Sequence, residues 1–158
     1  MSHIEEGKTN LVFADLPAIL GNQEALAHHP CIKLMRQAFS LVAKSYGGEV
    51  KTFYYNFDHE EQQTNTGLAL HIPHHGERPR GQAIPRGIGL VIDEKTGALM
   101  FRGDPWLVDK AFYALVQKQI IQKYTALSHA AALRLMGYQV SLQQTEDQKI
   151  TITGATYA

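Results

Sequence analysis

The sequence predicts an α+β fold, in which a mostly antiparallel sheet has two helices packed on one face. Two helical patterns, residues 31–46 and 105–136, are separated by a series of short β-rich segments. A short turn with glycine, residues 94–97, gives a strong hairpin signal among these segments. Hairpin connections dominate the expected order β-α-β-β-β-β-α-β-β, which favours antiparallel pairing, and a ferredoxin-like topology is one candidate arrangement.

The N-terminal part is predicted as a short strand, a helix start and a long helix. The strand covers residues 10–13, and Asp15 is expected to cap the helix start, with Pro17 in its first turn. In residues 31–46, apolar side chains recur every three and four positions, which is typical of an amphipathic helix. The glycine pair 47–48 ends it, because glycine adopts the left-handed conformation that many helix ends need.

The middle of the chain is predicted as two strands and an irregular loop. Residues 50–57 are aromatic and β-branched, residues 68–72 are apolar, and the polar residues 58–66 between them are expected to form a turn. Residues 73–87 contain three prolines and three glycines, so we expect no regular element there. A loop of about 15 residues is unusual in a compact domain and is either functional or disordered.

The C-terminal part is predicted as a hairpin, a long helix and two strands. Asp104 is expected to cap the helix, Pro105 takes its first position, and the pattern continues to Met136. The predicted strands are at residues 88–93, 98–102, 138–143 and 149–153, with the last turn through 145–147.

The long helix carries an apolar stripe wider than one sheet face normally covers. At 1.5 Å per residue it would measure about 48 Å, more than the width of a compact domain of this size. Either one helix crosses the sheet and bends, or the extra apolar face meets another chain. Trp106, at the helix start, is a candidate partner-binding residue, because such rings are enriched at interfaces, although a core role is equally open.

The composition indicates a globular protein with a single domain, residues 1–158. Hydrophobic residues make up 44% and charged residues 19%, and the net charge is zero. A global attraction to nucleic acid or to an acidic membrane is therefore not expected, although local patches remain open. The one cysteine forms no internal disulfide, the acidic N-terminus does not resemble a signal peptide, and no apolar run could span a bilayer. We therefore expect a cytoplasmic protein.

Three imidazoles lie within five residues, at His71, His74 and His75. Imidazole nitrogen is a good ligand for zinc, copper or nickel, so this cluster is the candidate metal site. No cysteine or HExxH partner completes it, and the spacing matches no fixed metal motif. The alternatives are a solvated, titratable loop and a histidine acid–base or phosphate contact.

Arg78, Arg80 and Arg86 form a second cluster in the same loop. Three guanidinium groups beside glycines could hold phosphate groups or an acidic partner, so these arginines are candidate partner-binding residues. The loop has no aromatic residue, so base stacking is not indicated there. The alternative is a solvated loop.

Cys31 lies close to His28 and His29 and could act as a thiol nucleophile, which a helix N-terminus would favour. No oxyanion-hole motif or third orienting group can be located, so we favour a small buried core residue. The acids 93–94 and Asp104 are explained by a turn and a cap. No dinucleotide-binding, phosphate-loop, nucleophile-elbow or EF-hand motif is present, and we predict no cofactor.

Several segments of the chain match the features of one known family. The chain begins Met-Ser-His, and it carries an isoleucine–glycine strand at residues 88–92, a strand before Asp104-Pro105-Trp106, and Lys123-Tyr124 ahead of Gly-Tyr-Gln-Val at 137–140. These features resemble the plastid and cyanobacterial conserved open-reading-frame-thirty-five family, known as domain of unknown function twelve fifty-seven. Asp104-Pro105 stands where that family more often has another tryptophan, and the middle of the chain departs from its pattern.

What this resemblance implies is a role rather than a reaction. The family has no established activity and no catalytic residues to transfer, and its genes often lie beside those of AAA-type ATPases. The resemblance therefore implies an accessory or adaptor protein. We expect, first, a non-enzymatic protein that binds another protein, with an AAA-type ATPase as one candidate partner and a homo-oligomer as another expectation. The alternatives are a metal-dependent or acid–base enzyme using the three histidines, and phosphate or nucleic-acid binding through the three arginines.

Overall fold

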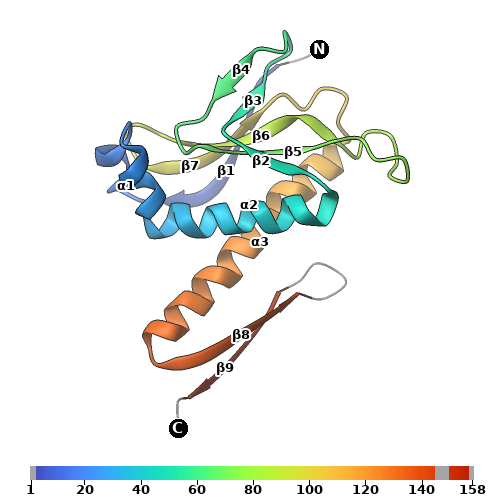
Figure 1. Cartoon of the computed structure of the whole chain (residues 1–158). Helices are drawn as coiled ribbons and strands as arrows, with labels where there is room; N and C mark the ends of the chain where they lie inside the picture. The colour runs from blue at the N-terminus through green and yellow to red at the C-terminus, as the bar shows by residue number, and fades with distance from the viewer. Residues whose placement is uncertain (1–2, 145–149, 157–158) are drawn as a thin grey trace.

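The protein is an α+β fold built around an antiparallel sheet, as the sequence predicts. The computed structural model describes residues 3–144 and 150–156. The main sheet has the order β1-β7-β6-β5-β2, and every neighbouring pair is antiparallel (Figure 1). Its strands are β1 (Glu5–Val12), β2 (Glu49–Lys51), β5 (Leu68–Ile72), β6 (Ile84–Ile92) and β7 (Ala98–Gly103).

Two helices lie on one side of this sheet, which confirms the predicted layering (Figure 1). α2 (Pro30–Tyr46) runs beneath the sheet and buries the apolar face that its sequence period predicts. Phe39 of α2 stacks on Phe101 of β7 with 6.4 Å between ring centroids. Gly47 ends α2 in the left-handed conformation, with φ 65°, as expected. These contacts fix one face of the sheet as the main core.

α3 (Lys110–Leu135) is a single unbroken helix of 26 residues, about 39 Å long. The first half of α3 lies beside the main sheet, and its second half extends beyond the sheet (Figure 1). There the hairpin of β8 (Tyr138–Gln144) and β9 (Ile150–Thr156) packs against it. Part of the wide apolar stripe is therefore covered by the chain's own C-terminal strands, an arrangement that the sequence reasoning had not considered.

The candidate ferredoxin-like arrangement is wrong. In that topology the second helix returns the chain to the same sheet. Here α3 leads instead to β8 and β9, which pair only with each other among the described residues. The predicted final turn, residues 145–147, lies outside the described residues.

A second, smaller layer covers the opposite face of the main sheet. β3 (Phe53–Tyr55) and β4 (Glu61–Gln63) form a two-stranded hairpin over β6. The single strand predicted at residues 50–57 is therefore two strands in two sheets, divided at Thr52, and β4 lies in the predicted turn. Gly89 of β6 allows this close packing, because a Cβ there would lie 2.7 Å from side-chain carbons of Tyr54 and Thr64.

The irregular loop is shorter than predicted, because β6 begins at Ile84 and includes Pro85 and Arg86. Proline is tolerated here because β6 pairs with β7 only from Gly89 onward, so this end of β6 lies at an edge. The loop itself thus spans residues 73–83. None of the helices among the described residues has the length and apolarity needed to cross a membrane.

Two short helices precede α2. The predicted helix start at Asp15 is a 3₁₀ turn, η1 (Leu16–Ile19), and Asp15 makes no side-chain capping bond. α1 (Gln23–His28) was not predicted, although Asn22 caps it with an amide oxygen 3.1 Å from the backbone nitrogen of Ala25.

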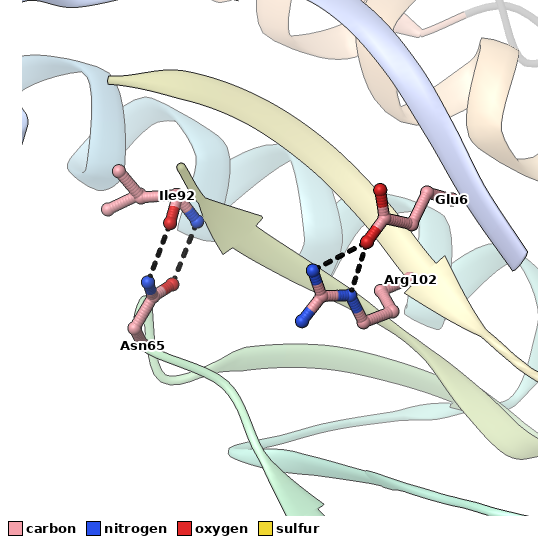
Figure 2. Close-up of polar contacts among 4 residues, drawn as sticks. All are labelled: Glu6, Asn65, Ile92 and Arg102. Carbon is pink, nitrogen blue, oxygen red and sulfur yellow. Dashed lines mark hydrogen bonds and ion pairs between the residues drawn. The ribbon is translucent and has the colours of Figure 1, made fainter. Parts of the chain in front are cut away.

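Polar side chains fasten the strands at their ends (Figure 2). Arg102 of β7 donates two hydrogen bonds to one carboxylate oxygen of Glu6 on β1, at 3.1 and 2.6 Å. Asn65, in the β4–β5 turn, exchanges two hydrogen bonds with the backbone of Ile92 on β6. Glu6 and Arg102 face each other within the β1–β7 ladder, whereas Asn65 binds β6 beyond the end of its pairing with β5.

Candidate functional site

An exposed aromatic pair and an arginine meet where β6, the β3–β4 turn and the β7–α3 connection converge. The guanidinium carbon of Arg86 lies 5.4 Å from the ring centroid of Phe57 and 5.5 Å from that of Trp106. The two rings touch edge to face with 5.5 Å between centroids. Phe57 is 54% exposed and Trp106 40% exposed, so these large rings contact each other without being buried.

The β7–α3 connection holds Trp106 in place through a buried carboxylate. Asp104 is 1% exposed; one of its oxygens accepts from the backbone nitrogen of Trp106 at 3.1 Å, and the other lies 3.5 Å from Arg86 Nη1. Val108 donates its backbone hydrogen bond to Pro105 at 2.9 Å. Leu107 takes a φ of 67°, which is strained for a leucine, and is 75% exposed. The turn therefore directs two large apolar side chains outward.

This turn corrects the predicted start of the long helix. Asp104 and Pro105 form the turn, and α3 begins at Lys110 with Asp109 as its cap, which accepts from the backbone nitrogen of Phe112 at 2.9 Å. Both aspartates precede helix-compatible residues, but the left-handed Leu107 separates the turn from the helix.

A pocket of about 460 Å³ opens beside this aromatic pair. The backbone of the 73–83 loop reaches it through Gly81, whose carbonyl accepts from Asp109 N at 3.0 Å. Arg80 is exposed and makes no hydrogen bond or ion pair with any described residue. We call the surface formed by Phe57 and five pocket-lining residues the Arg86–Trp106 surface; those five are His74, Arg80, Arg86, Trp106 and Leu107.

The charge of this surface is positive. Asp104 is the one acidic residue lining the pocket, and it is already paired with Arg86. Arg86 Nη1 is buried and makes no hydrogen bond within the described part of the chain. Arg80 adds a second guanidinium at the rim, which has no ion-pair partner in the described part of the chain. An apolar aromatic floor with a cationic rim is suited to a segment that carries both apolar and carboxylate side chains.

The third predicted arginine, Arg78, serves the fold instead. Its guanidinium donates to the carbonyl oxygens of Tyr46 at 2.8 Å and Pro73 at 2.6 Å. It also lies 5.6 Å from the centroid of the Tyr46 ring. Because Tyr46 is the last residue of α2, this cation caps the negative end of the helix. Arg78 therefore differs in role from Arg80 and Arg86.

The three predicted histidines do not converge. His71 is buried on β5, where Nε2 contacts the Phe53 carbonyl oxygen at 2.6 Å and Nδ1 the Pro85 carbonyl oxygen at 3.3 Å. His74 lines the pocket, and His75 is exposed. In the described part of the chain, no three His, Cys, Asp or Glu side chains are grouped to hold a metal ion. The arrangement thus offers no ligand set for the metal hypothesis.

The thiol hypothesis fails on burial. Cys31 is 2% exposed, and burial raises the pKa of its thiol to about 11. His29 is not a base for it, because His29 Nδ1 accepts from the backbone nitrogen of Cys31 at 3.1 Å and Nε2 contacts Asp15 at 2.9 Å. His29 is thus the cap of α2, and Cys31 is a core residue, as favoured above.

A second pocket, of about 610 Å³, lies on the other side of the Asp104–Val108 turn. It is lined by acidic residues of β1 and by the first turns of α3, including Tyr113. The Tyr113 hydroxyl is buried without a hydrogen-bond partner among the described residues, and burial raises its pKa above the ordinary range. This pocket shares Trp106 and Leu107 with the first, so the Trp106 ring and the Leu107 side chain border both pockets.

Of the Arg86–Trp106 surface, the sequence predicts Trp106, Arg80 and Arg86 as partner-binding residues and His74 as a metal ligand, but it does not single out Phe57 or Leu107. A large aromatic residue directly before the polar turn at Asp58 was the available signal for Phe57. Nothing in the sequence marks Leu107 as exposed, because it continues an apolar helical pattern. The chain matches no family model, no curated protein and no solved structure.

Proposed function

We propose that this protein is a non-enzymatic accessory protein that binds another protein through the Arg86–Trp106 surface. The observation that carries the proposal is the exposure of Phe57, Trp106 and Leu107 beside two arginines. Aromatic and arginine side chains are the residues most enriched at the energetic centre of interfaces. Large apolar side chains gathered at one exposed place are typical of a contact surface.

The surface is also preorganised, which favours binding over a merely solvated loop. Asp104 accepts a hydrogen bond from the Trp106 backbone, and the rings of Phe57 and Trp106 restrain each other. A rigid aromatic side chain loses little conformational entropy when a partner covers it. We infer that Phe57 and Trp106 anchor the partner, while Arg80 selects for carboxylate groups at the rim.

The identity of the partner follows only from the family resemblance. Genes of the resembled family often lie beside those of AAA-type ATPases, so an ATPase of this class is the first partner to test. The proposal requires no reaction at the surface: the partner would be recruited or positioned, and its own site would perform any chemistry.

The test uses Trp106, which is the only tryptophan in the chain, as an internal probe. A purified AAA-type ATPase without tryptophan, or with its own tryptophans replaced, is titrated into the protein while Trp106 emission is followed. We expect a saturable change in emission. Arg80→Glu should weaken the affinity by about tenfold or more, since it reverses a rim charge. Arg134→Glu, an exposed arginine at the far end of α3, is the matched control and should bind like the natural protein.

Two results would contradict the proposal. One is equal weakening by Arg80→Glu and Arg134→Glu, which would indicate a nonspecific charge effect. The other is retention of all partners by a folded Phe57→Ala/Trp106→Ala protein in pull-down experiments, with folding checked by circular dichroism. A captured protein supports the proposal only if it binds the Phe57→Ala/Trp106→Ala variant more weakly than the natural protein.

A further inference from the structure

The net charge of the chain is zero, but the charges are unevenly distributed between the helices α2 and α3 and the rest of the fold. α2 and α3 together contain no Asp or Glu. Among the described residues, the acidic side chains lie in strands, in loops and in α1 instead. The helical layer is therefore uniformly basic; its cationic side chains are Lys33, Arg36, Lys44, Lys110, Lys118, Lys123 and Arg134.

A groove with an apolar floor lies in this basic layer, away from the Arg86–Trp106 surface. It has a volume of about 640 Å³ and is bounded by α2, α3 and β8. Each of these elements contributes one leucine, namely Leu41, Leu127 and Leu142. Leu142 is 37% exposed, and Leu41 is only partly buried.

Two cations border the groove, at Arg36 and Lys44. Both are exposed, and neither makes an ion pair with any residue that the structure describes. They lie eight residues apart on α2, a separation of about 12 Å along the helix. Among the residues that the structure describes, no acidic side chain lines the groove. Its chemistry is thus apolar in the centre and positive at two points spaced by about two helical turns.

We propose that this groove binds an amphipathic helix of another protein, with leucine-type side chains on one face and carboxylates about two turns apart. Such a helix would place its apolar side chains against Leu41, Leu127 and Leu142. Its carboxylates would pair with Arg36 and Lys44. Helix-in-groove recognition of this kind uses apolar anchors spaced by three and four residues. The inference is independent of the proposed function, because it concerns a different surface.

Charge complementarity selects this occupant over three others. A second copy that docked through its own α2 or α3 would bring only positive charge against a positive rim. Nucleic acid binding uses stacked aromatic rings and dense cations, whereas the groove is lined by leucines and two cations. A membrane surface would favour a convex apolar face rather than a groove.

The experiment places a probe inside the groove. Ser40 lines it and is exposed, whereas the native Cys31 is buried, so Ser40→Cys can be labelled selectively with an environment-sensitive fluorophore. Gln122→Cys, exposed on α3 outside the groove, carries the same label as a control. The ligand is a designed sixteen-residue helix with leucines at three- and four-residue spacing and glutamates two turns apart. We expect a saturable change at Ser40→Cys and none at Gln122→Cys.

Charge reversal then tests the rim. Arg36→Glu/Lys44→Glu should weaken peptide binding by about tenfold or more, and a peptide with lysines in place of the glutamates should bind this variant better than the natural protein. Lys95→Glu/Lys118→Glu changes the net charge equally at exposed positions outside the groove and should bind like the natural protein. Urea unfolding of each variant confirms that it is folded.

Three outcomes would overturn the inference. These are equal binding of a scrambled peptide, absence of binding at about 1 mM peptide, and an equal loss in both charge-reversal variants. Binding of anionic vesicles or of an oligonucleotide that depends on Arg36 and Lys44, without peptide binding, would assign the groove to another ligand. Concentration-dependent dimerisation abolished by Arg36→Glu/Lys44→Glu would assign it to a second copy. Trp106 emission is recorded in the same titrations. Because Trp106 lies outside the groove, a change in its emission would report binding at the Arg86–Trp106 surface instead.

Discussion

The side-chain amide of Asn65 forms both hydrogen bonds that the backbone of Ile92 would otherwise make with a strand. Its Nδ2 donates to the Ile92 carbonyl oxygen at 2.8 Å, and its Oδ1 accepts from the Ile92 nitrogen at 2.8 Å (Figure 2). β5 begins at Leu68, which pairs with Leu90, so β6 extends past the end of its neighbour. Asn65 therefore continues the ladder with a side chain where backbone pairing has ended.

Asn65→Ala should lower the free energy of unfolding by about 1–2 kcal/mol, because it removes two hydrogen bonds and leaves the Ile92 backbone to water. Asn65→Asp keeps the acceptor but places a carboxylate oxygen against the Ile92 carbonyl oxygen, so it should be destabilised at least as much. Urea unfolding measures both. Gln122→Ala, an exposed amide on α3, serves as the control, and an Asn65→Ala protein as stable as this control would refute the structural role of Asn65.

Gly89→Ala should destabilise the protein by about 1–3 kcal/mol, since overpacking costs this much. The new Cβ would lie 2.7 Å from side-chain carbons of Tyr54 and Thr64 and would push the β3–β4 hairpin off β6. Gly76→Ala is the matched control, because nothing lies within 4 Å of a Cβ at that position. Thermal unfolding distinguishes the two, and similar stabilities would show that the hairpin does not pack closely on Gly89.

His71 should make stability depend on pH below 6.5. Burial lowers its pKa from 6.5, although its contacts with the Phe53 and Pro85 carbonyls oppose this. The unfolded chain therefore binds a proton that the folded protein does not, so the stabilisation is complete above pH 6.5 and is lost as pH falls toward the folded-state pKa. His71→Gln, whose amide can still donate to Phe53, should show a shallower decrease.

The measurement for His71 is urea unfolding of both proteins at a series of pH values, compared as a difference so that the other histidines cancel. Parallel curves below pH 6.5 would show that His71 has the same pKa in the folded and unfolded states. A natural protein that gains stability relative to His71→Gln on acidification would reverse the sign and indicate a charged imidazolium held by the two carbonyls.

Cys31 should be inert toward thiol reagents while the protein is folded. Its thiol is buried, and a pKa of about 11 keeps the thiolate fraction very small at neutral pH. A colourimetric disulfide reagent should therefore react only as fast as the chain unfolds, with a rate that rises through the urea transition. Rapid stoichiometric reaction in the absence of urea would contradict this and would restore the thiol nucleophile as a hypothesis.

Local signals predicted most of the fold, because the structure of several segments is determined by residues within the segment itself. The apolar run at residues 68–72 is β5, and the glycine after Tyr46 ends α2. The turn at Gly97 joins β6 and β7 with φ 79°, as the hairpin signal indicates. In each case the interaction that decides the structure lies within a few residues of the segment.

The errors arose where distant contacts decide the structure. Thr52 divides one apparent strand because the β3–β4 hairpin must cross to the opposite face of the sheet. Arg78 and Arg80 are two residues apart in one loop, yet only Arg78 reaches the end of α2. The sequence placed the three arginines in one cluster, and only the packing of α2 separates the structural Arg78 from the exposed Arg80.

The position of β1 has a consequence for how the chain is made. β2, β5, β6 and β7 follow one another along the sequence, whereas β1 pairs with β7 and the Glu6–Arg102 bond spans 96 residues. During translation, the first strand therefore has no neighbour until β7 has been synthesised. At ordinary rates of about 5–20 residues per second, this interval lasts roughly 5–20 s. In a nascent chain that is stalled before β7, the first strand would remain unpaired and accessible to chaperones.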